Sequence, residues 1–275
     1  MRTPLALWLI LVLFGLAIRA DGQELRIYTL TRDVTAEPAA KAPIISRSLT
    51  LFHAGKVYDY ISELREVTIF EPAHHRFTVL NEPAAAYAMI SQDQVRRFLT
   101  LAEDRARELA GDFLREDDPM KRQAVELLQF QLFPQFDPRF DTASRQLTLT
   151  APRYAYEVSC MEGSEPQVVE RYLVYADALA EFNSVLHPQS FLPGPRLALN
   201  QALRDRQVLP VKVLRKVDFD GKQALLAEHE WRWSLTEFDR QLITNWESQI
   251  VKGQVRELSF EQMQRAVLTG KLAPR

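Results

Sequence analysis

The feature that most constrains the fold is a run of short segments in which side chains alternate between two faces, joined by tight turns. Residues 49–53 and 57–61 alternate in this way on either side of Ala54-Gly55, where glycine accepts a positive φ. Residues 66–71 and 76–81 form a second pair across a four-residue loop. Four strands in series with tight connections predict an antiparallel meander.

Both faces of this meander carry large apolar side chains. A sheet with one face in water would show polar residues on that face. We therefore expect both faces to be covered by helices, by curling of the sheet, or by a ligand. The predicted sides are Tyr58, Tyr60 and Phe70 on one face, with Val57, Ile61 and Ile69 on the other.

Two helices are predicted after the meander. Ser91 and Gln94 form a capping box that begins the first helix. Asp118 followed by Pro119 begins the second, because a proline at the first helical position loses no hydrogen bond there. Residues 134–141 repeat Pro-x-Phe-Asp and are predicted to form an ordered loop.

The middle of the chain is predicted to mix strands and helices. Strands are expected at 146–150, 154–160 and 168–175, and helices at 178–186 and 197–206. Three prolines between these helices bar regular structure. We interpret residues 178–206 as a helical, proline-rich insertion.

The last third holds the longest predicted hairpin. Residues 208–217 form one strand, and residues 223–235 return as the second after a turn at 218–221. One face of the returning strand carries Leu225, Ala227, His229, Trp231, Trp233 and Leu235. Thr236 and Ser259 are predicted to cap two final helices. The fold class is therefore predicted as α+β, a curved antiparallel sheet of eight to eleven strands packed on several helices.

Residues 1–20 have the layout of a secretory signal peptide. Arg2 gives a positive start, and the uncharged apolar run 5–18 follows. This run is shorter than the roughly 20 residues that cross a bilayer as a helix. We predict cleavage after Ala20, a single domain over 21–275 and a periplasmic or secreted location. An uncleaved amino-terminal anchor is the alternative.

Charge and cysteine content exclude two classes of protein. Without Arg2 and Arg19 the chain carries 32 basic and 36 acidic side chains, a formal charge of −4. Because no basic excess is present to neutralise a phosphate backbone, nucleic acid is not a predicted partner. Cys160 is the only cysteine, so no internal disulfide can form. Its position in the predicted strand 154–160 indicates a buried thiol.

The sequence contains none of the common catalytic or cofactor motifs. It lacks a G-x-S-x-G turn, an H-E-x-x-H pair and the glycine patterns that bind nucleotides. We predict no metal, no cofactor and no enzymatic activity. One alternative stays open, a hydrolase in which His53, His74 or His75 meets Asp59 across neighbouring hairpins.

The predicted sheet also carries candidates for the lining of a ligand cavity. A curled sheet with helices across its mouth can enclose a dry pocket. The candidate residues are Tyr58, Tyr60, Phe70, His229, Trp231 and Trp233.

Residues 48–61 (SLTLFHAGKVYDYI) place a G-K-x-Y-x-Y strand before the V-T-x-F-x-P strand of residues 66–72, and residues 209–235 form a hairpin with a D-x-x-G turn. These stretches resemble the periplasmic lipoprotein-carrier (LolA-like) superfamily. The resemblance implies a half-barrel of antiparallel strands over helices, with an apolar cavity for lipid or acyl groups and no catalytic residues. Residues 178–206 have no counterpart there, and no arginine is assigned to the cavity mouth.

Together these observations favour an exported, non-enzymatic binding or carrier protein for a lipid or other apolar ligand. The alternative is a cell-envelope interaction or assembly protein with no ligand cavity. Its partner site would lie on the loop 188–195 or on an exposed strand edge.

Overall fold

The computed structural model describes residues 24–163, 165–187, 191–219 and 221–269. The predicted signal peptide and the start of the 188–195 loop lie outside these residues. The described chain forms one twelve-stranded sheet and six α-helices. The predicted α+β class is confirmed, but the sheet has one strand more than the eight to eleven predicted. The strands are β1 (Leu25–Asp33), β2 (Ile44–His53), β3 (Lys56–Ile61), β4 (Glu66–Glu71), β5 (Arg76–Asn81), β6 (Ala86–Ser91), β7 (Asp137–Asp141), β8 (Gln146–Ala151), β9 (Tyr154–Glu162), β10 (Val208–Asp218), β11 (Lys222–Arg232) and β12 (Arg256–Leu258). The helices are α1 (Gln92–Phe113), α2 (Pro119–Leu132), α3 (Pro166–Leu186), α4 (Gly194–Arg206), α5 (Glu237–Val251) and α6 (Phe260–Thr269), with a short 3-10 helix at Pro72–His74.

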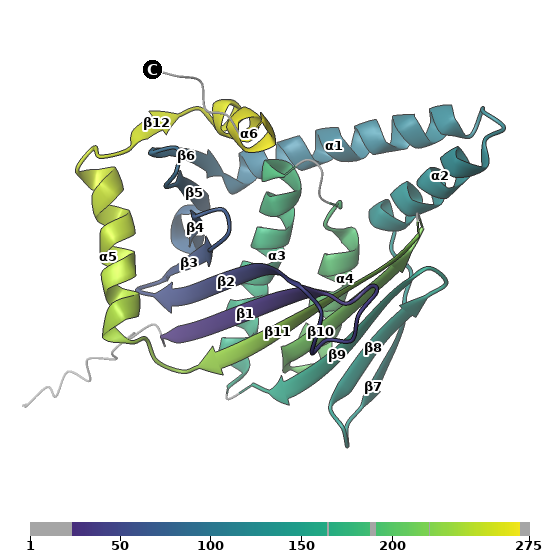
Figure 1. Cartoon of the computed structure of the whole chain (residues 1–275), viewed down its shortest axis with the longest axis horizontal. Helices are drawn as coiled ribbons and strands as arrows, with labels where there is room; N and C mark the ends of the chain where they lie inside the picture. The colour runs from purple at the N-terminus through teal and green to yellow at the C-terminus, as the bar shows by residue number, and fades with distance from the viewer. Residues whose placement is uncertain (1–23, 164, 188–190, 220, 270–275) are drawn as a thin grey trace, which may run out of the picture.

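The strands follow the order β12-β6-β5-β4-β3-β2-β1-β11-β10-β9-β8-β7. Every neighbouring pair is antiparallel except β12 and β6, which are parallel. Strands β2 to β6 form one meander, and β7 to β11 form the other half of the sheet. Strand β1 joins the halves, because it pairs with β2 on one side and with β11 on the other (Figure 1).

The predicted hairpins are confirmed. Ala54 and Gly55 both adopt a positive φ, of 48° and 77°, as a two-residue hairpin turn requires. Strand β3 follows immediately and pairs with β2 from Lys56 to Ile61. The long hairpin of β10 and β11 is also present, and it places His229 opposite Thr29 of β1. Its returning strand ends at Arg232 and not at residue 235, so Trp233 and Leu235 lie beyond the predicted strand face.

Two predicted elements are wrong. Residues 168–175 are not a strand but the first half of α3, which begins at Pro166 and continues past residue 178. Their apolar residues recur at a spacing of three to four, which is a helical period. Residues 137–141 are not a loop but β7, the last strand of the sheet. Pro138 is tolerated there because an edge strand has one side without ladder hydrogen bonds.

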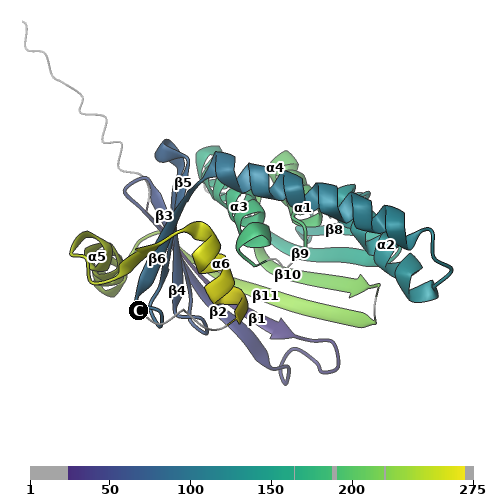
Figure 2. The same ribbon diagram turned by 90° about the horizontal axis from the view of Figure 1, so that it is seen from above.

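The helices divide between the two faces of the sheet. Figure 2 shows α1 to α4 gathered on one face, here called the inner face, and α5 on the other, the outer face. On the inner face Phe77 stacks on Phe182 of α3, with 4.4 Å between the ring centroids. Tyr58 stacks on Trp246 of α5 at 6.3 Å on the outer face. The prediction that both faces of the meander are covered is therefore confirmed.

The register corrects the predicted sides of the meander. Val57 lies opposite Phe70, and Tyr58 lies opposite Ile69. Because directly opposed residues of an antiparallel pair share a face, Phe70 lies with Val57 on the inner face and not with Tyr58. The alternation within each strand is as predicted, and only the register between the strands differs.

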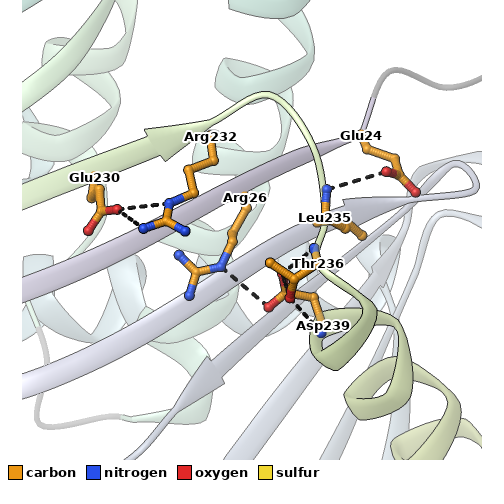
Figure 3. A network of polar contacts seen from close by, with 7 residues as sticks. All are labelled: Glu24, Arg26, Glu230, Arg232, Leu235, Thr236 and Asp239. Atoms are coloured by element: carbon orange, nitrogen blue, oxygen red, sulfur yellow. Dashed lines mark hydrogen bonds and ion pairs between the residues drawn. The ribbon is translucent and has the colours of Figure 1, made fainter.

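The amino-terminal end of α5 is attached to β1 (Figure 3). Thr236 and Asp239 form a capping box, in which the Thr236 side chain accepts from the Asp239 amide. The Asp239 carboxylate also accepts from Arg26 Nε at 3.3 Å. Glu24 accepts from the Leu235 amide at 3.3 Å. These contacts fix α5 against the outer face where the chain leaves β11.

Candidate functional site

The middle of the inner face carries polar side chains where an apolar core would be expected. The register places them in two adjacent rows, because His229 lies opposite Thr29 and Thr50 lies opposite Asp59. We call this set the polar belt, and its members are Thr29, Ser48, Thr50, Asp59, Thr68 and His229. Burying polar groups costs free energy unless they are hydrogen-bonded, so such a belt needs partners.

A cavity of about 300 Å³ lies between the polar belt and helices α3 and α4. We call it the polar pocket. Helix α3 contributes Tyr172, Tyr175 and Asn183 to its wall, and α4 contributes Arg196. The belt contributes every member except Thr68. The walls are therefore rich in hydroxyl groups and contain one guanidinium.

Asp59 is the buried acid of this pocket. The Thr50 hydroxyl donates to its carboxylate at 2.7 Å. Burial raises the pKa of Asp59, and hydrogen bonds from Thr50 and Tyr175 oppose that shift. Glu66, two residues before Thr68 on β4, is also buried, and its pKa is raised for the same reason. The inner face thus holds two buried carboxyl groups whose pKa values are raised by burial.

His229 is held in its neutral form. Burial lowers the pKa of His229 to about 3, and the positive charge of Arg196 acts in the same direction. Its Nδ1 lies 2.8 Å from the Thr29 hydroxyl oxygen. Its Nε2 is covered from solvent and has no hydrogen-bond partner among the described residues. The imidazole therefore keeps one uncommitted polar atom inside the molecule.

Arg196 supplies the positive charge of the polar pocket. It lies at the start of α4 and makes no ion pair with another described residue. Burial raises the pKa of Tyr172, and the charge of Arg196 and a hydrogen bond from it oppose that shift. Arg196 therefore faces the Tyr172 hydroxyl and the His229 ring within one cavity.

A second cavity, of about 470 Å³, lies beside the first and is lined mainly by apolar groups. We call it the apolar pocket. Phe52, Val57 and Phe70 form its floor on the sheet, and Val174 of α3 lies on its other side. Tyr175 lines both pockets, so its ring separates the apolar one from the polar one.

Arg171 of α3 lines the apolar pocket without an anionic partner. Its guanidinium lies over the Phe52 ring, 5.2 Å from the centroid. Its Nε and Nη2 are covered from solvent and have no hydrogen-bond partner among the described residues. Burial lowers the pKa of Arg171. Two donor nitrogens of the Arg171 guanidinium are thus without an acceptor beside an apolar surface.

The structure separates the six residues predicted to line one cavity. Phe70 lines the apolar pocket and His229 lines the polar pocket. Trp231 packs edge-on against Tyr172 at 5.0 Å and donates its Nε1 hydrogen to the Pro210 carbonyl. Trp233 is 42% exposed. Tyr58 and Tyr60 lie on the outer face against Trp246, away from both pockets.

The three histidines considered for hydrolysis have other neighbours. His53 Nδ1 lies 3.3 Å from Glu24 Oε1, and His74 Nδ1 lies 3.2 Å from Glu71 Oε2. His75 Nδ1 lies 2.9 Å from Gln92 Oε1. Asp59 instead contacts Thr50 and Tyr175 on the inner face. The arrangement that a hydrolase would need does not assemble from these side chains in the described structure.

Other predicted features have the following environments. Cys160 is partly buried, and burial raises the pKa of its thiol to about 11. Within the described ranges, no three His, Cys, Asp or Glu side chains gather in a way that could hold a metal ion. The helices of the described chain include none that is both long and apolar enough to span a membrane.

Sequence reasoning missed Arg171, Tyr175 and Arg196. The first two fall in the segment predicted as a strand, and Arg196 falls in the segment interpreted as an insertion. The polar belt had a usable signal, since Thr50 and Asp59 are the polar residues within the otherwise apolar stretches 49–52 and 57–61.

Comparison with models of protein families and with curated proteins finds no match to this chain. The two pockets are therefore the features that bear on function.

Proposed function

We propose that this protein is a non-enzymatic binding or carrier protein for a lipid or other apolar ligand, and that the ligand occupies the apolar pocket. The observation that carries the proposal is an apolar cavity with an unpaired guanidinium in its wall. Ligand pockets are concave, mostly apolar and contain a few polar groups that orient the ligand. The volume of about 470 Å³ falls in the usual range for such sites.

Arg171 indicates which end of the ligand is polar. A guanidinium forms strong, two-pronged hydrogen bonds with carboxylate and phosphate groups. Leaving the covered Nε and Nη2 of Arg171 without acceptors is costly, and an acidic ligand head would supply the missing acceptors. The ligand is therefore an amphiphile whose acidic head faces Arg171 and whose chain contacts Phe52, Val57 and Phe70.

The half-barrel of the lipoprotein-carrier superfamily and export through residues 1–20 belong to the same proposal. The paired hairpins and the closing hairpin that carry the resemblance form β2 to β4 and β10 to β11. Helix α3 lies over the inner face that these strands present, and the apolar pocket lies between them.

Titration of the purified protein with a fluorescent fatty acid tests the proposal. We expect saturable binding, and we expect Val174→Trp to weaken it by about tenfold or more because the indole fills the pocket. Val251→Trp is the matched control, since Val251 lies on α5 and is 85% exposed. Absence of saturable uptake by the unmodified protein would refute the proposal, as would equal affinity of the Val174→Trp variant.

The fluorescent alcohol of the same chain length tests the role of Arg171. Arg171→Met keeps an apolar stem of similar length and removes the charge. We expect this variant to bind the fatty acid about tenfold more weakly and the alcohol with nearly unchanged affinity. An equal loss for both probes would show that Arg171 only shapes the wall.

A further inference from the structure

The polar pocket is not explained by an apolar ligand. It holds Arg196 without an ionic partner among the described residues, and His229 Nε2 without a hydrogen-bond partner. Filling this space with hydrocarbon would leave the Arg196 charge without a counter-ion and His229 Nε2 without a hydrogen-bond partner, which costs free energy. A polar ligand would satisfy them.

The charge of the pocket defines the charge of such a ligand. Arg196 is positively charged and has no ion-pair partner among the described residues, and His229 is neutral. One negative charge on the ligand would therefore balance Arg196. A carboxylate carries one charge and matches the planar guanidinium, whereas a doubly charged group would meet only one cation and lie near the Asp59 carboxyl.

His229 defines a second group of the ligand. If Thr29 donates to Nδ1, the ring hydrogen is on Nε2, which then needs an acceptor. If Nδ1 instead donates to Thr29, Nε2 accepts. A hydroxyl group both donates and accepts, so it satisfies His229 in either tautomer. The hydroxyls of Ser48 on the sheet and of Tyr172 on α3 add further partners for a hydroxylated molecule.

We propose that the polar pocket is a second binding site, for a small hydroxy acid whose carboxylate binds Arg196 and Tyr172 and whose hydroxyl binds His229. The cavity of about 300 Å³ stands at the lower end of the range for ligand pockets, which suits a compound smaller than the proposed amphiphile. This inference does not rest on the proposed lipid binding, because Tyr175 separates the two cavities.

Calorimetric titration with lactate, glycerate and gluconate tests the site. We expect at least one of them to bind saturably at one molecule per chain. Hexanoate has the charge without hydroxyls and sorbitol has hydroxyls without the charge, so both should bind about tenfold more weakly than that hydroxy acid. Inorganic phosphate should also bind more weakly. No saturable binding of any hydroxy acid would overturn the proposal, and so would equal binding of hexanoate, sorbitol or phosphate.

Variants locate the site. Arg196→Gln should weaken hydroxy-acid binding by about tenfold, while Arg206→Gln on the exposed end of the same helix should leave it within about twofold. Tyr172→Phe removes one hydroxyl and keeps the ring against Trp231, so it serves if the Arg196 variant fails to fold. Unchanged affinity in Tyr172→Phe and in folded Arg196→Gln would overturn the assignment. Val174→Trp should not affect hydroxy-acid binding, which separates this result from the fatty-acid test.

Discussion

Single residues of the inner face link the stability of the fold to pH. Asp59 is buried beside Thr50 and Tyr175, and burial raises its pKa in the folded protein. The folded state therefore holds the Asp59 proton to higher pH than the unfolded chain does. The contribution of this group to stability is fully present below the unfolded pKa near 3.9 and is lost as pH rises toward the folded pKa. His229 has the opposite sign, because its folded pKa is lowered.

Asp59→Asn removes the first of these effects. We expect the variant to gain stability relative to the unmodified protein as pH rises above about 4, by up to about 1.4 kcal/mol per pH unit within the titration window. Urea unfolding at pH 4, 5.5 and 7 measures this difference. Asp205→Asn on the exposed side of α4 is the control and should show no such trend. Parallel pH profiles of Asp59→Asn and the unmodified protein would contradict the prediction.

The candidate site was only partly predictable at this scale. Phe70 and His229 were singled out because large or titratable side chains on strands attract notice, and each does line a pocket. Tyr58 and Tyr60 look the same in sequence but lie on the other face, since alternation gives two sides without saying which one a ligand meets. Arg171 and Arg196 stand out because neither has an ion-pair partner among the described residues. Local sequence does not contain that information.

Individual elements are held by contacts at their ends, and α5 shows this most clearly. Thr236 and Asp239 cap the helix, and Asp239 also pairs with Arg26 of β1 (Figure 3). The carboxylate of Asp239 is buried, so it serves the helix and the sheet at once. Its removal leaves the Thr236 backbone amide and the Arg26 guanidinium without this carboxylate.

Substitutions of Thr236 and of Asp239 should therefore lower the free energy of unfolding by different amounts. We expect Thr236→Ala to lower the free energy of unfolding by about 1 kcal/mol, as a lost cap does. Asp239→Ala should lower it by about 3 kcal/mol, because a partly buried charge is also left unpaired. Ser91→Ala at the cap of α1 is the control for a cap alone. Urea unfolding that gives equal costs for the two α5 variants would show that the Arg26 contact adds nothing.

Elements with a local signal were predicted from the sequence, and those set by tertiary contacts were not. The capping box at Ser91 and the Asp118-Pro119 start each lie where a helix begins. Residues 168–175 contain valine and tyrosine, which suit strands, but packing against the inner face selects the helical period. Strand β7 depends on its pairing with β8. No pattern within residues 137–141 predicts that pairing.

At the scale of the whole molecule, the sheet separates two apolar clusters. The inner cluster includes Phe52, Phe77 and Phe182, and both pockets border it. The outer cluster includes Tyr58 and Ile69 of the sheet and Trp246 of α5. The outer cluster thus stabilises the strands whose opposite faces line the pockets.

Trp246→Ala tests that division. We expect it to lower the free energy of unfolding by about 3–5 kcal/mol, because a fully buried indole is lost. Phe238→Ala on the same helix should cost less than about 0.5 kcal/mol, since Phe238 is 65% exposed. Denaturant unfolding checks both values. A cost for Trp246→Ala close to that for Phe238→Ala would show that α5 contributes little to the sheet.

Strand β1 has a consequence for the order of assembly. It is the first strand of the described chain, yet residues 225–232 provide one of its two neighbours. Strands β2 to β6 can pair with their neighbours in sequence as soon as they are synthesised, whereas the two halves of the sheet can join only after residues 225–232 have been made. Closing so large a loop is entropically expensive and slow. Until β11 pairs with β1, one edge of β1 has no neighbouring strand. This open edge is the place where the nascent protein is most exposed to aggregation.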